Sequence, residues 1–460
     1  MLKKYFGDRA FYRYAFAVAL PIIIQNGIGN FVSLLDNIMI GQVGTVQMNG
    51  VSIVNQLIFV FNLCIFGATS GAGIFTAQFH GCKDHEGVRS TFRFKILIGL
   101  LLSAVAIIVF LLFGVPLIQL YLQGEGTPED AALTLQYGLQ YLKIMLWGLP
   151  IFAISNAYAG TLRESGQTVV PMVASSAAVF VNMGLNFVLI FGHLGFEPMG
   201  IRGAAIATVI SRYVELAIVA GWTHLNPSRN IFIQDAYRTL CIPGPLLRTI
   251  IVKGMPLLLN EAFWSTAMAI MSQCYSTRGL DVVAAQNINS ALYNLSSVVY
   301  MAMGNSVGII IGQMLGAGKS EEEVRDTDRK LIVTSVLSCL IFGSLMVAVS
   351  GIFPQVYNTS DEIRSLATKL ICISALFLPF NAYTHATYFT LRSGGQTWIT
   401  FLYDCCYVWT LCVPLAFCLS RFTTIGILNM FFLCHCLDFV KCFFGGAMIK
   451  QGKWIHNLTK

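Results

Sequence analysis

Long apolar runs, each about as long as a helix that crosses a membrane, alternate with short polar segments along this chain. A transmembrane helix needs about 20 predominantly apolar residues. Reading the runs against charged residues, Gly and Pro predicts twelve spans, at residues 14–40, 51–78, 96–121, 134–160, 168–192, 203–223, 249–274, 286–315, 331–355, 365–390, 395–419 and 424–447. The pattern therefore predicts an all-α polytopic membrane protein with short loops.

Composition narrows the class of protein further. Only 11% of the residues are charged and 56% are hydrophobic, whereas about a quarter of the residues of a soluble domain are charged. The net charge of +7 could indicate an anionic partner, but Lys and Arg lie at the ends of apolar runs, where they anchor helices. We expect the lipid bilayer as partner, and no nucleic acid.

Thirteen cysteines could indicate a redox or metal site, but their positions do not. No CxxC pair exists, and seven cysteines lie inside apolar runs near the C-terminus, where Cys behaves as a small hydrophobic residue. Cys434, His435 and Cys436 form only a weak candidate metal site. The basic N-terminus continues directly into the first apolar run, which predicts a retained span and no cleaved signal peptide.

The distribution of Lys and Arg predicts the orientation. The N-terminus, the loops after the even-numbered spans and the C-terminus together carry twenty, including Lys3, Lys83, Arg229, Lys319 and Lys450. The loops after the odd-numbered spans carry only four, which are Arg202, Arg278, Arg364 and Arg421. By the positive-inside rule, both termini are predicted to be cytoplasmic, in a multi-pass protein of the cell membrane.

The two halves of the sequence repeat one another. A shift of 235 positions matches Pro21 with Pro256 and Gly81 with Gly316, and a shift of 229 matches residues 161–168 with residues 390–397. Six spans separate the matched positions, so the halves share one orientation. This predicts two six-helix lobes, residues 1–235 and 236–460, related by a pseudo-two-fold axis along the membrane normal, a plan common among transporters.

Ionisable residues inside a span are costly and usually face a cavity or a partner. Asp36 in the first span has no basic residue within reach on its own helix, and lies at a membrane depth similar to that of Asn182 and Asn186. The two asparagines are four residues apart and so share a helix face. Their oxygens could bind a small cation such as sodium, in which case these three residues are the metal ligands, or Asp36 could take up a proton. The alternative is a hydrogen-bonded carboxylate that only joins helices.

A second group of polar residues lies in the other half. Glu261 is near the middle of the seventh span, beside Asn260 and one turn before Trp264, and an acid beside an aromatic ring can attract a lipophilic cation. Asp404 lies in the eleventh span. These four residues are candidates for substrate binding or coupling, although a purely structural pairing stays open for Glu261 and Asp404.

Two charged pairs are expected to be structural. Arg212 with Glu215, and Asp438 with Lys441, are each three residues apart and so share a helix face. At a shift of 226 the pairs coincide with reversed signs, so each could neutralise itself or bridge to the other half.

Proline is expected to bend two equivalent helices. Pro21 and Pro256 lack the amide hydrogen that a helix interior needs, so they should kink the first and seventh spans at equal depths.

The sequence contains no complete motif of a soluble enzyme. The run from Gly312 to Ser320 resembles a phosphate-binding loop, but its spacing is one residue too long and it ends a membrane helix where a strand should precede it. His85 and Glu86 lack the second histidine of a zinc protease helix, and there is no GxSxG. We expect no enzyme, no ATP-driven step and no cofactor.

These features together resemble the multidrug and toxic compound extrusion (MATE) family: the early Pro21 followed by LLDNIMIG around Asp36, the TLRESGQT turn after the fourth span, and Asn182 with Asn186. The resemblance implies export of amphipathic, often cationic compounds, driven by inward sodium or proton movement. It implies a cation site of Asp36, Asn182 and Asn186 with Thr208. Some members carry a span-seven glutamate where this chain has Trp264, and a span-ten aspartate that this chain lacks, so Glu261 matches only approximately.

The sequence therefore predicts a monomeric secondary antiporter that exports small amphipathic molecules in exchange for Na⁺ or H⁺ by alternating access. In this hypothesis the substrate enters a cavity between the lobes, and a cation that reaches the Asp36 cluster disfavours the bound substrate. The alternative is a flippase for a lipid-linked oligosaccharide or peptidoglycan precursor, which would favour several basic residues facing the cavity. A channel or receptor fits less well, because the duplicated spans leave no room for a large soluble domain.

Overall fold

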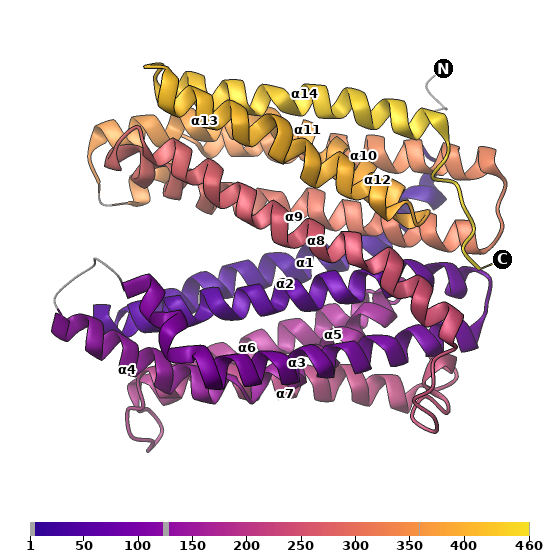
Figure 1. Ribbon diagram of the computed structural model, residues 1–460, viewed down its shortest axis with the longest axis horizontal. Helices are drawn as coiled ribbons and strands as arrows, with labels where there is room; N and C mark the ends of the chain where they lie inside the picture. The colour runs from indigo at the N-terminus through magenta and orange to yellow at the C-terminus, as the bar shows by residue number, and fades with distance from the viewer. Residues whose placement is uncertain (1–4, 123–127, 358, 460) are drawn as a thin grey trace. The chain divides into compact units, whose positions relative to one another are not determined.

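The computed structural model describes residues 5–122, 128–357 and 359–459, and these residues are almost wholly helical (Figure 1). Their long helices are α1 (Arg9–Gly41), α2 (Thr45–Gly81), α3 (His85–Leu122), α4 (Pro128–Met145), α5 (Gly148–Glu164), α6 (Val169–Phe191), α7 (Ile201–Leu225), α8 (Gly244–Ser276), α9 (Leu280–Gly316), α10 (Glu321–Val349), α11 (Asp361–Ser393) and α14 (Ile427–Gln451). Short 3₁₀ helices, Ile231–Ile233 and Phe353–Val356, lie in the linkers.

The segment between α11 and α14 is less regular. A short α12 (Thr397–Phe401) continues into two π-helical turns, Leu402–Cys406 and Val408–Cys412, and then into α13 (Val413–Phe422). The π-helical turn is rare and is frequently found at functional sites. Asp404 lies within the first of the two turns.

The chain divides into two compact units that are not continuous in sequence. The N-terminal unit comprises Ile24–Thr76 and His85–Ile250, and the C-terminal unit comprises Met1–Ile23, Ala77–Asp84 and Ile251–Lys460. Three of the four unit boundaries fall inside α1, α2 and α8, and the fourth lies between α2 and α3. The predicted division at residue 235 rests on the sequence repeat and stays a prediction.

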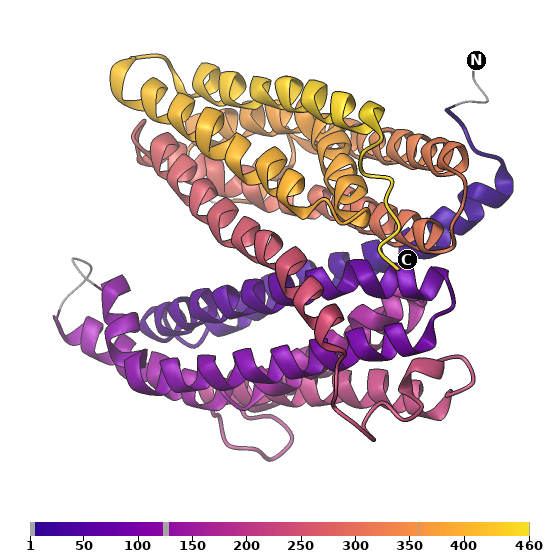
Figure 2. The ribbon, with the colours of Figure 1, turned by 45° about the vertical axis from the view of Figure 1, so that its right-hand side comes forward.

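Each unit is a bundle of packed helices. In the N-terminal unit α6 packs on α7, and α5 packs on both α3 and α7. In the C-terminal unit α11 lies between α9, α10 and α14, an arrangement that both views show (Figures 1 and 2). Small residues allow the close approaches: a Cβ added to Gly343 of α10 would lie 2.9 Å from the Ala375 carbonyl oxygen of α11.

Several helix ends follow directly from the local sequence. Ser320 caps α10 and accepts a hydrogen bond from the Glu323 amide at 3.3 Å, as the first residue of a Ser-x-x-Glu capping box does. Ser360 caps α11 in the same way. Gly192 and Gly452, with φ of 77° and 72°, end α6 and α14 in the left-handed conformation that glycine adopts without strain.

Large apolar side chains remain exposed on the outside of the helices. On α3, Leu111, Leu112 and Phe113 are 64%, 68% and 54% exposed. A soluble monomer rarely exposes apolar surface on this scale, whereas a membrane helix presents it to lipid. The exposed surface therefore agrees with the membrane class that the composition predicts.

Ten of the described helices are long and apolar enough to cross a membrane, and the pair α4 and α5, bent by 47°, adds an eleventh. The remaining predicted span, 249–274, is covered by α8, whose apolar stretch is interrupted by Asn260, Glu261, Ser265 and Thr266. The all-helical class is confirmed. The count of twelve spans and the two-fold relation of the lobes stay predictions.

Candidate functional site

The N-terminal unit brings together four polar residues from three helices. Asp36 lies near the end of α1, Asn182 and Asn186 lie one turn apart on α6, and Thr208 lies on α7. Asn182 and Asn186 are 6% and 1% exposed, and Asp36 is half-buried. The i, i+4 spacing places both amides on the face of α6 that the helix buries. We call these four residues the Asp36 cluster.

A chain of hydrogen bonds connects the cluster. The Asn186 amide nitrogen donates to Asp36 Oδ1 at 2.7 Å and lies 3.3 Å from Asn182 Oδ1. The Asn182 nitrogen lies 3.3 Å from the Thr208 hydroxyl, which itself donates to the Ala204 carbonyl at 3.0 Å. Turning the Asn182 amide by 180° places its nitrogen 2.9 Å from Asp36 Oδ2 and its oxygen 3.3 Å from Thr208 Oγ1.

One oxygen of the cluster has no partner among the described residues. Asn186 Oδ1 is buried and receives no hydrogen bond there. A buried acceptor without a donor is unusual and needs a reason such as an ion or a water. Together with the Asp36 carboxylate, the Asn182 amide and the Thr208 hydroxyl, it completes a set of hard oxygen ligands of the kind that small cations prefer.

No basic side chain neutralises Asp36 within the part of the chain that the structure describes. The ion pairs found there do not include Asp36. Arg212 of α7 lies 3.4 Å from Glu215 and 4.8 Å from the centre of the Phe152 ring. Asp36 therefore has no resident counter-charge among the described residues.

Two neighbours of the cluster were not singled out from the sequence. Tyr141 of α4 is 3% exposed, its side chain interacts with Thr208, and its hydroxyl donates to Asn55 Oδ1 of α2 at 3.4 Å. A tyrosine and an asparagine in apolar spans give no signal of their own, because both are common at helix contacts. They link the cluster to two further helices.

The C-terminal unit holds a second buried polar group, around Asp404. Lys441 Nζ of α14 lies 2.6 Å from Asp404 Oδ1, and the Asn260 amide of α8 donates to Asp404 Oδ2 at 3.0 Å. The Lys441 ammonium also faces the rings of Tyr403 and Tyr407, at 5.2 and 5.9 Å from their centres, close enough for cation–π attraction.

The expected pairing of Lys441 with Asp438 is therefore replaced by a longer-range one. The π-helical turns of residues 402–412 carry Asp404 to α14, so Lys441 bridges two segments and does not close a pair on its own helix. The second expected pair, Arg212 with Glu215, does lie within one helix, at 3.4 Å.

Glu261 and Trp264 lie on α8, in the same unit as Asp404. Glu261 is half-buried, and its carboxylate interacts electrostatically with Asp404 and Arg392. Trp264 is 39% exposed. Pro21 and Pro256 lie inside α1 and α8, which continue past them.

Two buried charges near the helix ends were missed or misread in the sequence. Lys95, 1% exposed, pairs with Glu164 and lies 3.3 Å from the Thr161 hydroxyl, although we counted it as a loop cation. Asp328, also 1% exposed, accepts a hydrogen bond from the Thr390 hydroxyl at 2.5 Å. Thr161 and Thr390 are equivalent in the sequence repeat, so each half places one buried charge against the same threonine.

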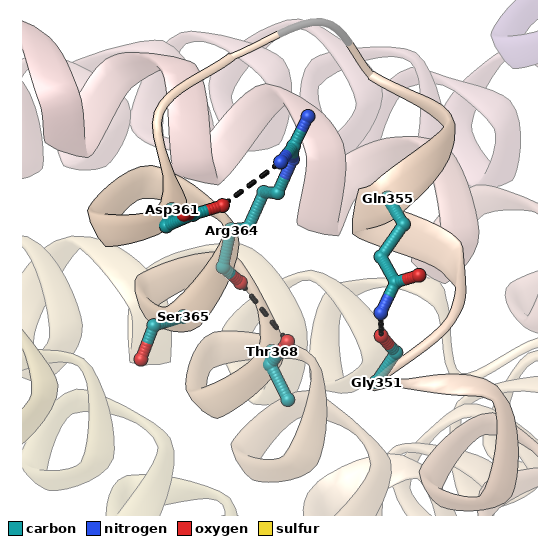
Figure 3. Close-up of a pocket in the computed structure, with 6 residues that line it drawn as sticks. All are labelled: Gly351, Gln355, Asp361, Arg364, Ser365 and Thr368. Carbon is teal, nitrogen blue, oxygen red and sulfur yellow. Dashed lines mark hydrogen bonds and ion pairs between the residues drawn. The ribbon is translucent and has the colours of Figure 1, made fainter.

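A surface hollow elsewhere contains none of the candidate residues. Its lining residues are Gly351, Gln355, Asp361, Arg364, Ser365 and Thr368, at the start of α11 (Figure 3). Arg364 pairs with Asp361 at 2.9 Å, and Gln355 donates to the Gly351 carbonyl at 3.1 Å, so these polar groups largely satisfy one another. In the described residues, no group of three or more His, Cys, Asp or Glu side chains has a metal-binding arrangement.

Comparison with known proteins gives matches over nearly the whole chain. The family model MatE matches residues 21–188 and 256–418. The probable multidrug resistance protein NorM of Thermotoga maritima is 25% identical over 414 residues, which cover 90% of this chain and 86% of that protein. The multidrug resistance protein MdtK of Cronobacter sakazakii is 23% identical, over 82% of this chain and 80% of that protein.

Solved structures show the same fold. A variant of the MATE transporter VcmN of Vibrio cholerae superposes with a TM-score of 0.84 at 17% identity, over 97% of this chain and 98% of that one. A MOP superfamily transporter of Pyrococcus furiosus gives a TM-score of 0.84 at 18% identity, over 98% of each chain.

Proposed function

Because this chain belongs to the MatE family of multidrug and toxic compound extrusion transporters, we propose that it is a secondary active antiporter that exports amphipathic or cationic compounds in exchange for inward Na⁺ or H⁺. The protein acts as a monomer in the cell membrane, with twelve spans in two six-helix lobes and both termini in the cytoplasm. The multidrug resistance proteins named above, with which it aligns over most of its length, support drug export.

The observation that carries the coupling role is the Asp36 cluster. It combines a carboxylate that no basic residue of the described chain neutralises with the unpartnered oxygen of Asn186, in a site lined by oxygen ligands. A sodium ion would be held by Asp36, Asn182, Asn186 and Thr208. A proton would be held by Asp36, with the amides as its hydrogen-bond partners.

The cluster can drive transport only if its occupancy differs between two states of the protein. A ligand shifts a conformational equilibrium only by its difference in affinity for the two states. Cation binding from the outer side, followed by release inside, supplies this difference, and a membrane potential adds about 2.3 kcal/mol per charge per 100 mV. The Asp36 cluster must then be accessible first from one side of the membrane and then from the other.

The flippase alternative is not favoured. Cargo with phosphate groups would need several basic residues free to face it, but the buried Lys95 and Lys441 are both held by acidic partners. The relatives named above are multidrug resistance proteins.

Efflux from reconstituted vesicles tests the proposal. The purified protein in proteoliposomes should concentrate a fluorescent lipophilic cation when a sodium gradient and a pH gradient are imposed separately, with the response identifying the coupling ion. Vesicles that show no concentrative transport under either gradient would contradict the antiporter assignment.

A further inference from the structure

The residues after α14 fold back across the helix ends of the C-terminal unit, as the yellow end of the chain shows (Figure 2). Gly452, in the left-handed conformation with φ of 72°, ends α14 and turns the chain. A Cβ at this position would lie 1.6 Å from Nη2 of Arg325, whose Nη1 donates to the Lys450 carbonyl at 3.1 Å. The start of α10 therefore fixes the direction in which the tail leaves.

The tail, which we define as residues 453–459, is bound along its length. Trp454 is 1% exposed and packs in the same apolar core as Ile311 and Leu315 of α9. The Gln396 amide donates to the Lys453 carbonyl at 3.2 Å, and a Cβ on Gly394 would meet the Trp454 carbonyl oxygen at 1.6 Å. The tail is therefore packed closely against α9 and the residues that follow α11.

Gln78, at the end of α2, is the residue that the tail encloses. Its side chain is fully buried; the amide nitrogen donates to the Ser393 carbonyl at 2.8 Å and to the His456 carbonyl at 3.2 Å. Its amide oxygen accepts from the Leu458 backbone nitrogen at 2.7 Å. One side chain therefore joins the end of α2 to the end of α11 and to the tail.

The end of α2 also touches α9 without intervening side chains. A Cβ on Gly81 would lie 2.0 Å from the Gln313 carbonyl oxygen, and a Cβ on Gly316 would lie 1.8 Å from the Gln78 carbonyl oxygen. At this reciprocal contact neither helix has room for a side chain larger than glycine. Gln78, which bonds to the end of α11 and to the tail, therefore lies directly at the contact of α2 with α9.

The other half of the sequence repeat holds its own following segment in the same manner. In the N-terminal unit, Gln167 donates to Asn230 Oδ1 at 3.2 Å, and Arg93 donates to the Asp235 and Ala236 carbonyls at 2.9 and 2.8 Å. Gln167 corresponds to Gln396 at the shift of 229, and Arg93, like Arg325, donates to carbonyls of the segment that it holds. This linker, however, does not bind the Gln78 side chain, so it serves as a natural control for the tail.

We propose that the tail is a latch that holds the end of α2 on the ends of α9 and α11, and that its release is the step that opens this face of the protein. The inference rests on the alternating access of the proposed function. Since the end of α2 and the tail share the Gln78 bonds, a variant that weakens the latch shifts the equilibrium toward the open face.

The test uses a reporter under the latch. Ser393→Cys places a nearly isosteric thiol at a position that is 3% exposed, in a full-length protein whose exposed Cys82, Cys241 and Cys418 are replaced by Ser. A membrane-impermeant maleimide is applied from the side of the tail. Its labelling rate is compared in the parent, in Gln78→Leu, in Leu458→Pro, which lacks the backbone donor to Gln78, and in the control Gln167→Leu.

We expect labelling about fivefold or more faster in Gln78→Leu and Leu458→Pro, since a net hydrogen bond contributes about 1 kcal/mol, and no change in Gln167→Leu. Leu458→Pro should keep the melting temperature of the parent in detergent, which distinguishes release from unfolding. Equal labelling of all four proteins, faster labelling in Gln167→Leu as well, or a rate that rises only with a fall in melting temperature would overturn the latch.

The labelling result is independent of the transport assay. If the variants label faster than the parent as expected, but the parent fails to concentrate any cation, the proposed function is contradicted and the latch is still supported. A parent that transports under an ion gradient, with labelling equal in every variant, would contradict the latch alone.

Discussion

Asp36 and Asp404 are both acids placed inside membrane helices, but their surroundings differ. Asp36 lies among amides and a hydroxyl and has no Lys or Arg partner in the described chain, while Asp404 is held by Lys441 at 2.6 Å. An unneutralised carboxylate can bind and release an external cation. A carboxylate with a resident ammonium is better suited to joining helices, which is why we assign coupling to Asp36.

The Asp404 pair gives a test at the residue scale. Lys441→Met should leave Asp404 buried without its counter-charge, and breaking one partner of a buried pair costs about 3–5 kcal/mol. We expect a clear fall in the melting temperature of the detergent-solubilised protein. The double variant Lys441→Met with Asp404→Asn removes both charges and should recover most of the loss. A double variant as unstable as the single one would show that the pair itself is not the cause.

The sequence could predict the members of the Asp36 cluster because the reasoning there is local. The i, i+4 spacing of Asn182 and Asn186 and the isolated charge of Asp36 are visible in the printed chain. It could not predict the partner of Lys441. Asp438 is only three residues from Lys441, so the sequence favours it as the partner. The π-helical turns that bring Asp404 close to Lys441 depend on tertiary packing, which residue types alone do not predict.

At the scale of helices, glycine sets how closely α2 and α9 approach. Gly81 and Gly316 are visible in the printed chain as a repeated pair, but nothing there indicates that each faces the backbone of the other helix. Most of the long helices were predicted, because apolar runs of this length leave few alternatives, but the predicted span 134–160 is two helices, α4 and α5, bent by 47°. Their ends, where the Gln78 bonds and the tail lie, depend on tertiary contacts.

The contact between α2 and α9 predicts that a methyl group added at Gly81 destabilises the protein, whereas one added at an uncrowded glycine does not. Gly81→Ala would place a Cβ 2.0 Å from the Gln313 carbonyl oxygen, and overpacking of this kind costs about 1–3 kcal/mol. We expect a lower melting temperature and less folded protein in the membrane.

Gly221→Ala on α7, where a Cβ meets nothing within 4 Å, is the matched control. It should be neutral or stabilising by about 0.4–1 kcal/mol, because alanine restricts the unfolded chain. Similar melting temperatures for the two variants would contradict the close approach of α2 and α9.

At the scale of the whole molecule, both ends of the described chain lie at the same end of the C-terminal unit. The centre of the Tyr5 ring lies 6.0 Å from the guanidinium carbon of Arg329, and Arg325 of the same helix end donates to the Lys450 carbonyl. This placement agrees with the even number of spans that the sequence predicts. The distribution of Lys and Arg predicts that both termini are on the cytoplasmic side of the membrane, and this orientation stays a prediction.

The orientation can be tested with native cysteines. Cys82 and Cys241 are exposed and lie in segments predicted to be cytoplasmic. An impermeant maleimide should label both in inside-out vesicles and neither in intact cells. Labelling of either cysteine from outside intact cells would invert the topology.

Coupling through Asp36 is tested most directly by comparing driven and undriven transport in the same proteoliposomes. Asp36→Asn keeps the shape of the side chain and removes its charge, and Glu129→Gln on the exposed first turn of α4 is the matched control. We expect concentrative uptake driven by a sodium or pH gradient to fall about 5- to 150-fold in Asp36→Asn, the usual range of a coupling free energy, while substrate counterflow without an ion gradient persists and Glu129→Gln behaves as the parent. Gradient-driven uptake at the parent rate in Asp36→Asn would contradict the account.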